Sequence, residues 1–169
     1  MALTTLDIIL RMSTAIGLGM VLGLERTLAG KTAGMRTYSM ITLGSTIFIL
    51  ISEVVISTLS SALIASPLAV ATSVVSGIGF IGAGLIIFQG NKISGLTTAA
   101  GLWVAAGVGM ACGFGLYTLA TIATIGAMII FTIMWFIEDI LKKYSYSLEK
   151  SRIKVHEKLS ELDSSEKNE

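Results

Sequence analysis

Charge is what this 169-residue chain lacks over most of its length. Charged residues make up 14% of the sequence and hydrophobic residues 53%, whereas charged residues are about a quarter of an ordinary soluble domain. Between Val54 and Ile137 the only charged residue is Lys92, and that stretch has no Asp, Glu, Arg or His. Such a stretch must be surrounded by lipid or by other helices. The composition therefore excludes an ordinary soluble domain and predicts an integral membrane protein.

Cysteine and histidine are also scarce, with one residue of each. Cys112 cannot form an internal disulfide, and it has no second cysteine or nearby histidine with which to bind a metal. His156 lies in a charged C-terminal region, and no nucleophilic residue has a base at a useful spacing. We therefore expect no enzyme activity. The basic residues form no patch with interleaved aromatics, so we expect no nucleic-acid binding either.

The apolar residues fall into five segments, each close to the roughly 20 residues that a helix needs to cross a bilayer. The segments are apolar on all sides, whereas strands of a membrane barrel would alternate apolar and polar residues. We predict an all-α membrane protein, a bundle of about five transmembrane helices over residues 1–137, with four helices as the alternative. The five segments run from about Leu6 to Leu24, Thr37 to Leu59, Leu68 to Phe88, Leu96 to Phe114 and Leu116 to Ile137.

Beyond the last segment the composition changes abruptly. Residues 138–169 hold seven Lys or Arg and eight Asp or Glu, which predicts a charged cytoplasmic tail, partly helical or disordered. Basic residues favour the cytoplasmic side of a membrane, and those of the loops all fall on one side if the N-terminus lies outside. The C-terminus is then cytoplasmic. These basic residues are Arg26, Lys31, Arg36, Lys92, Lys142 and Lys143.

Glycine is plentiful, and the stretch Gly77-Ile78-Gly79-Phe80-Ile81-Gly82 matches the dinucleotide-binding pattern G-x-G-x-x-G. That pattern requires a preceding strand and an acidic residue about 20 positions on, where this chain has Leu102, Trp103 and Val104. No nucleotide is therefore expected. Small residues at four-residue spacing indicate instead that helices pack closely in lipid, so we predict a compact bundle or a homo-oligomer, with a dimer favoured. The candidate packing faces are Ala15, Gly19 and Gly23; Gly79 and Ala83; and Gly101, Ala105, Gly109 and Gly113.

One group of charges lies at the outer side of the predicted membrane segments, where charged groups are costly and often functional. Asp7 and Arg11 are four residues apart, so we expect them to form an ion pair on one helix. The alternative is that Arg11 pairs with Glu53, which would join two helices.

A second group, Glu25, Arg26, Lys31 and Arg36, lies on the cytoplasmic side. We expect a positively charged anchor in which Glu25 bridges to Arg36; the alternative is a site for a small anion, for a cation at Glu25, or for a protein partner. Mg²⁺ prefers oxygen ligands in octahedral geometry. Glu25 is the one carboxylate on this side within residues 1–137, so it is the candidate metal ligand, and a complete site would need symmetry copies or backbone carbonyls. No other cofactor is expected.

Two stretches resemble the MgtC/SapB family of bacterial inner-membrane proteins. They are GLERTLAGKTAGMRTYSMITLGS, from Gly23 to Ser45, and VVSGIGFIGAGLIIFQGNKISGLTTAAGLWVAAGVGMACGFGLY, from Val74 to Tyr117. The first is similar to the family's G-x-E-R followed by G-K-x-A-G-L-R-T, and the second contains its GIGFIGAG signature within a membrane helix. The resemblance extends from about Leu6 to Ile133.

The resemblance implies a four- or five-helix membrane domain with the N-terminus outside. It implies a link to survival in low Mg²⁺ and to acid tolerance, and a prototype that restrains the F-type ATP synthase. The family's charged positions fall on Arg11, Glu25, Arg26, Lys31 and Arg36, and its G-L-x-T-A-A turn falls on Gly95, Leu96, Thr97, Thr98, Ala99 and Ala100.

The chain also departs from the family pattern. The run SPLAVA lacks the acidic residue and the arginine that are common before the third helix, and Ser94 stands where an arginine is usual. Lys92 is the nearest cation to that position. The tail is too short for the folded C-terminal domain of larger members.

These observations predict a non-enzymatic membrane protein that regulates a membrane partner, with membrane lipids as its surroundings and the F-type ATP synthase as the candidate partner. The alternative is an ion transporter or channel formed by a homo-oligomer, with a pathway lined by Glu25, Arg36, Thr97 and Thr98. In either case glycines would provide helix packing or flexibility along a pathway. The glycines in question are Gly77, Gly79, Gly82, Gly84, Gly95, Gly101 and Gly109.

Overall fold

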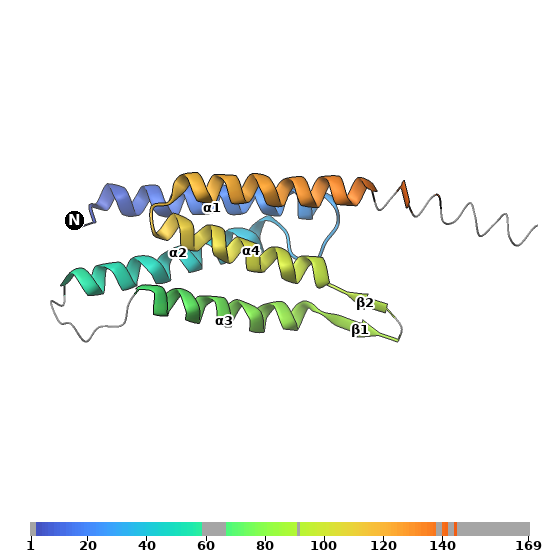
Figure 1. The fold of residues 1–169 in the computed structure, drawn as a ribbon, viewed down its shortest axis with the longest axis horizontal. Helices are drawn as coiled ribbons and strands as arrows, with labels where there is room; N and C mark the ends of the chain where they lie inside the picture. Colours follow the sequence, from blue (N-terminus) through green and yellow to red (C-terminus); the bar gives the residue numbers. More distant parts are fainter. Residues whose placement is uncertain (1–2, 59–66, 91, 138–139, 142–143, 145–169) are drawn as a thin grey trace, which may run out of the picture. The chain divides into compact units, whose positions relative to one another are not determined.

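The computed structural model describes residues 3–58, 67–90, 92–137, 140, 141 and 144. The chain divides into two compact units, Met1–Ile129 and Ile130–Glu169. The first unit contains the four labelled helices and a two-stranded hairpin (Figure 1). These elements are α1 (Thr5–Leu28), α2 (Met35–Thr58), α3 (Pro67–Leu85), β1 (Ile87–Gln89), β2 (Lys92–Ser94) and α4 (Leu96–Gly113).

A fifth helix, Tyr117–Ile137, begins in the first unit and ends in the second. Within the described residues, five helices are long and apolar enough to cross a membrane, which confirms the predicted all-α membrane fold. In the second unit the described residues, 130–137, 140, 141 and 144, are helical. The predicted charged tail lies outside the described residues at all its other positions.

Helix α1 begins with a capping box that its sequence supplies. The Thr4 hydroxyl accepts a 3.2 Å hydrogen bond from the Asp7 amide, and the Asp7 carboxylate accepts one of 3.0 Å from the Thr4 amide. These two bonds satisfy amide groups that a helix start leaves without partners. The helix then runs for 24 residues, about 36 Å, which exceeds the roughly 30 Å thickness of bilayer hydrocarbon.

Helices α2 and α4 are the central elements of the first unit, because each packs against the other and against both α1 and α3. Helix α2 also has close backbone contacts with α1 and α4. The contacts with α1 and α4 are close enough that only glycine fits. A Cβ atom added to Gly19 of α1 would lie 2.8 Å from the Cα of Ser39, and one added to Gly109 of α4 would lie 2.8 Å from the Cα of Thr42. The small-residue faces of the first and fourth segments therefore pack within the chain.

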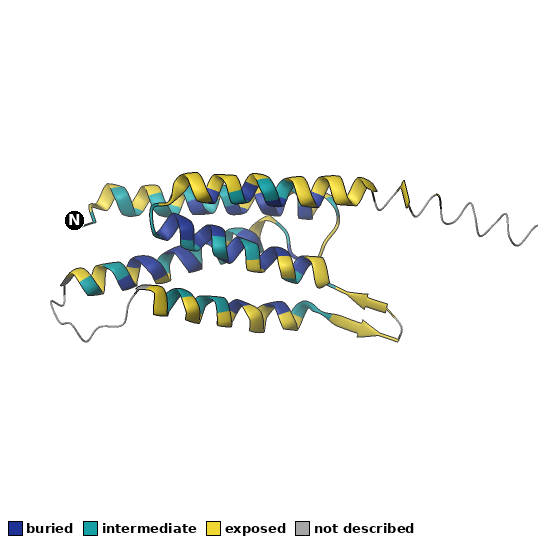
Figure 2. Ribbon diagram, viewed as in Figure 1, coloured by how far each residue is buried: buried dark blue, intermediate teal, exposed yellow. Residues whose placement is uncertain are grey.

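Burial differs sharply between α4 and α3 (Figure 2). The chain buries 56% of the membrane-spanning window of α4 but 11% of that of α3. Helix α4 is thus the interior helix, as its alternation of Gly and Ala allows. The glycines of GIGFIGAG behave differently: a Cβ at Gly77, Gly79 or Gly84 would meet nothing within 4 Å, while one at Gly82 would lie 3.6 Å from the Ala99 Cβ. Most of this signature faces out of the unit.

The third segment ends earlier than the sequence predicted. Helix α3 stops at Leu85, and Ile87 and Phe88 belong to β1, which pairs antiparallel with β2. The predicted end at Phe88 is therefore wrong. Two left-handed glycines explain the change, since Gly90 (φ 57°) turns the hairpin and Gly95 (φ 87°) returns the chain to α4.

Candidate functional site

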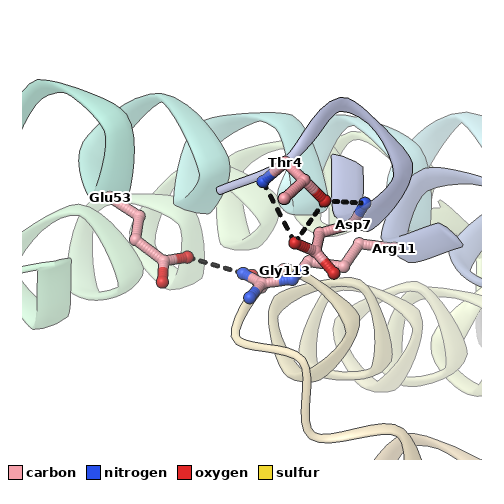
Figure 3. Close-up of polar contacts among 5 residues, drawn as sticks. All are labelled: Thr4, Asp7, Arg11, Glu53 and Gly113. Carbon is pink, nitrogen blue, oxygen red and sulfur yellow. Dashed lines mark hydrogen bonds and ion pairs between the residues drawn. The ribbon is translucent and has the colours of Figure 1, made fainter. Parts of the chain in front are cut away.

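Arg11 connects three helices near one end of the first unit (Figure 3). Its Nη1 atom lies 2.6 Å from the Oε2 atom of Glu53 on α2 and also donates a 2.6 Å hydrogen bond to the carbonyl oxygen of Gly113, the last residue of α4. We call Arg11, Glu53 and Gly113 the Arg11 clamp. The prediction of an Asp7–Arg11 ion pair is wrong. The Asp7 carboxylate accepts hydrogen bonds from the Thr4 amide and hydroxyl instead. The alternative, a link between two helices, is what the structure contains.

The Arg11 clamp satisfies three groups that would be costly to leave unpaired in a membrane. The Arg11 side chain is 14% exposed and that of Glu53 39%, so the ion pair is partly shielded from solvent. The guanidinium also lies at the C-terminus of α4, where helix carbonyls lack partners and the helix dipole favours a cation. Gly115 follows with φ 74°, and a Cβ there would lie 3.4 Å from the Arg11 Nη2. The turn after α4 therefore passes close to the guanidinium.

A second polar cluster lies where α1 ends and α2 begins. Arg26 is 3% exposed and forms an ion pair with its neighbour Glu25, because a buried guanidinium requires a counter-charge. The expected Glu25–Arg36 bridge is absent from the described residues, and Arg36 and Lys31 are exposed.

Tyr38 is fully buried on α2, and its hydroxyl has no hydrogen-bond partner among the described residues. Sequence reasoning missed Tyr38 as a member of the buried polar set.

The other predicted site residues differ in how far they are buried. Thr97 is exposed and Thr98 is buried, although they are neighbours at the start of α4. Gly101 is buried within the same helix. At Gly95 a Cβ would overlap the carbonyl oxygen of Leu85, so this glycine permits the close approach of α4 to the end of α3. The described residues contain no group of three or more His, Cys, Asp or Glu side chains that could hold a metal ion.

An apolar groove of about 450 Å³ lies between α2 and α3, and no sequence pattern indicated it. Ser45 and Ile78 are its buried residues, whereas Phe48 and Phe80 are exposed beside it. Gly77 contributes bare backbone to the wall. The groove exists because α3 packs less completely than the other labelled helices, which hydropathy alone cannot reveal.

Comparison with known proteins identifies relatives of the chain. The MgtC family model matches residues 12–140. The "Putative magnesium transporter YhiD" of Escherichia coli is 39% identical over 98 residues, which cover 57% of this chain and 46% of that protein. "Protein MgtC" of Brucella abortus is 36% identical over 108 residues, 64% of this chain and 43% of that protein. "Protein MgtC" of Salmonella typhimurium is 41% identical over 92 residues, 54% of this chain and 37% of that protein.

The matched regions cover less than half of the length of these curated relatives. No solved structure matches the chain. The match to the family model includes the Glu25–Arg26 pair and the helices α3 and α4, because all of them lie within residues 12–140.

Proposed function

The chain belongs to the MgtC family of membrane proteins, and from this membership we propose that it is a non-enzymatic inner-membrane protein that regulates a membrane partner during Mg²⁺ limitation or acid stress. The F-type ATP synthase is the candidate partner. We further propose that the N-terminus lies outside and the C-terminus in the cytoplasm. Arg26, Lys31, Arg36 and Lys92 support this orientation, because basic residues favour the cytoplasmic side.

One observation carries the regulatory proposal: Arg11, Glu53, Glu25 and Arg26 are paired inside the chain. Arg11 is held by Glu53 and the Gly113 carbonyl, and Glu25 is held by Arg26. Helix α4, the natural candidate to line a passage, contacts α2 through glycines instead. A closely packed interior of this kind favours action through the outer surface, where large apolar side chains such as Phe80 and Leu68 of α3 are exposed.

The regulatory proposal predicts contact with the ATP synthase and no transport. The tagged full-length chain, cross-linked in membranes, should capture synthase membrane subunits, and adding the purified protein to inverted vesicles should lower ATP-driven proton pumping. A variant with Phe80→Ala and Leu68→Ala should capture less of the synthase. Pumping that is unaffected by the protein would contradict the proposal.

The second candidate function is transport of Mg²⁺ or another small ion by a homo-oligomer. It is favoured by the name of the YhiD relative and by the partly buried ion pair of Glu25 and Arg26. Proteoliposomes loaded with a Mg²⁺-sensitive dye distinguish the two functions. Protein-dependent flux that is lost in Glu25→Gln and kept in Lys31→Gln, an exposed neighbour, would support transport and replace the regulatory proposal.

A further inference from the structure

The β1–β2 hairpin has one face that is wholly apolar. Its register pairs Phe88 with Ile93, and directly paired residues of two antiparallel strands have their side chains on the same face. Phe88 is 71% exposed and Ile93 58%, so most of each side chain is uncovered. We call this pair the Phe88–Ile93 face. The opposite face holds the two other pairs, Gln89 with Lys92 and Ile87 with Ser94, because successive side chains of a strand alternate.

The Arg11 clamp indicates how deep the hairpin lies. Charged groups are costly in hydrocarbon, so Arg11 and Glu53 belong near one edge of it. From the Gly113 carbonyl that Arg11 binds, α4 extends back over 18 residues, about 27 Å, to Leu96. The hydrocarbon is roughly 30 Å thick, so Leu96 lies close to its opposite edge. The hairpin comes just before Leu96 and projects beyond the ends of α3 and α4, so it lies at that opposite boundary (Figure 1).

Two properties of the hairpin exclude the regions on either side of this boundary. The outer edge of each strand presents backbone amide and carbonyl groups, which hydrocarbon does not tolerate. The exposed side chains of Phe88 and Ile93, in contrast, gain free energy by leaving water. The headgroup layer between hydrocarbon and water is about 5–7 Å thick on each side and offers both hydrogen-bonding groups and apolar contact. A three-residue strand is about 10 Å long, so most of the hairpin fits within this layer.

We propose that the Phe88–Ile93 face inserts into the phospholipid headgroup layer at the edge of the acyl chains, and that Gln89 and Lys92 are directed to water. The occupant is the membrane in which α3 and α4 lie, so the contact continues their lipid-facing surface. Amphipathic segments bind this layer in the same way, with the apolar face inward. The inserted pair holds α3 at a fixed depth, where the chain itself buries 11% of the spanning window. The site is independent of the protein partner proposed above.

Spin labels on the purified full chain in lipid nanodiscs test the proposal. Cys112→Ala removes the native cysteine, and a single cysteine then replaces Phe88, Ile93, Gln89 or Lys92 in turn. Oxygen concentrates in lipid and a nickel chelate in water, so the relaxation that each causes reports the depth of the label. Labels at positions 88 and 93 should lie within about 7 Å of the hydrocarbon edge and collide mainly with oxygen. Labels at positions 89 and 92 should collide mainly with nickel.

Two double variants test the same face without a label. Phe88→Ser with Ile93→Ser removes the apolar side chains, and Gln89→Ser with Lys92→Ser is the matched control on the opposite face. Amide hydrogen exchange of the hairpin in nanodiscs should be faster than wild type in the first variant and unchanged in the control. Equal depth of all four labels would overturn the proposal, as would equal exchange in the two double variants. Labels at 88 and 93 that are shielded from both oxygen and nickel would overturn it too, and would assign the face to a protein surface.

Discussion

The hydroxyl of Thr46 on α2 donates a 2.7 Å hydrogen bond to the carbonyl oxygen of Gly109 on α4. It also lies 2.9 Å from the Thr42 carbonyl oxygen one turn earlier in its own helix. The bond across the helices is possible because Gly109 has no side chain to separate the two backbones. Glycine contacts and hydroxyl-to-carbonyl bonds are the forces expected between helices in lipid, where the hydrophobic effect does not drive association.

Adding a methyl group at Gly109 should therefore destabilise the protein. In Gly109→Ala the new Cβ would lie 2.8 Å from the Cα of Thr42, so the helices must move apart, at a cost of about 1–3 kcal/mol. Gly107→Ala is the control, because a Cβ there meets nothing within 4 Å and alanine is the better helix former. Thermal unfolding in detergent should show a lower midpoint for Gly109→Ala and an unchanged or higher one for Gly107→Ala. Equal midpoints would mean that α2 and α4 do not approach closely.

Removing either charge of the Arg11 clamp should have unequal effects. Arg11→Gln loses both the ion pair and the bond to the Gly113 carbonyl, whereas Glu53→Gln loses the ion pair alone. We expect a loss of about 2–3 kcal/mol for the arginine variant and less for the glutamate variant, since the partly exposed pair is worth less than a fully buried one.

A double-mutant cycle checks the assignment of partners at the Arg11 clamp. Unfolding measurements should give a coupling energy of about 1 kcal/mol between Arg11 and Glu53. The coupling between Asp7 and Arg11 should be smaller, because the Asp7 carboxylate is bonded to Thr4. Stronger coupling for the Asp7 pair would contradict the geometry in Figure 3.

Hydropathy and small-residue spacing predicted the membrane helices well, because each residue contributes to those signals independently of its partners. The start of α4 at Leu96 and the close contacts of Gly109 and Gly113 with α2 follow from such local patterns. The hairpin could not be predicted in this way. Ile87 and Phe88 are as apolar as the helix before them, and only the pairing with β2 makes them a strand.

Ionic partners were harder to predict than helices, because they depend on tertiary positions. Spacing in the sequence favoured Asp7 as the ionic partner of Arg11 and Arg36 as the ionic partner of Glu25, since the residues of each pair are near each other in the chain. The structure pairs Arg11 with Glu53, 42 residues away, because α1 and α2 lie against each other and Asp7 is used by the helix cap. Arg26 is buried, so it takes the nearest carboxylate, Glu25.

The turn into α4 should tolerate no side chain at Gly95. Its φ of 87° strains any other residue, and a Cβ would also overlap the Leu85 carbonyl oxygen. Gly90 has φ 57° but open space around its Cα. We expect Gly90→Ala to cost about 1 kcal/mol from backbone strain alone, and Gly95→Ala to cost clearly more. Detergent unfolding of the two variants side by side measures the difference, and similar losses would contradict the close contact with Leu85.

Replacing Tyr38 with phenylalanine tests whether its buried hydroxyl has a partner in the folded protein. The ring is fully buried and the hydroxyl has no hydrogen-bond partner among the described residues, and an unsatisfied buried hydroxyl costs about 1–3 kcal/mol. Tyr38→Phe keeps the ring and removes that cost, so the midpoint of thermal unfolding should stay the same or rise. Tyr38→Ala, which leaves a cavity, should lower it by the equivalent of about 3–5 kcal/mol.

A lower unfolding midpoint for Tyr38→Phe would change the interpretation of the polar cluster where α1 ends and α2 begins. A loss of stability or of function in that variant would mean that the hydroxyl binds a water, an ion or a neighbouring chain in the membrane. The partly buried pair Glu25–Arg26, at the end of α1, would then belong to a hydrated site. Measuring Mg²⁺ flux in Tyr38→Phe beside Glu25→Gln distinguishes these cases. Parallel losses of flux would support the transport function, whereas a stable Tyr38→Phe protein without flux in either variant or the wild type favours the regulatory one.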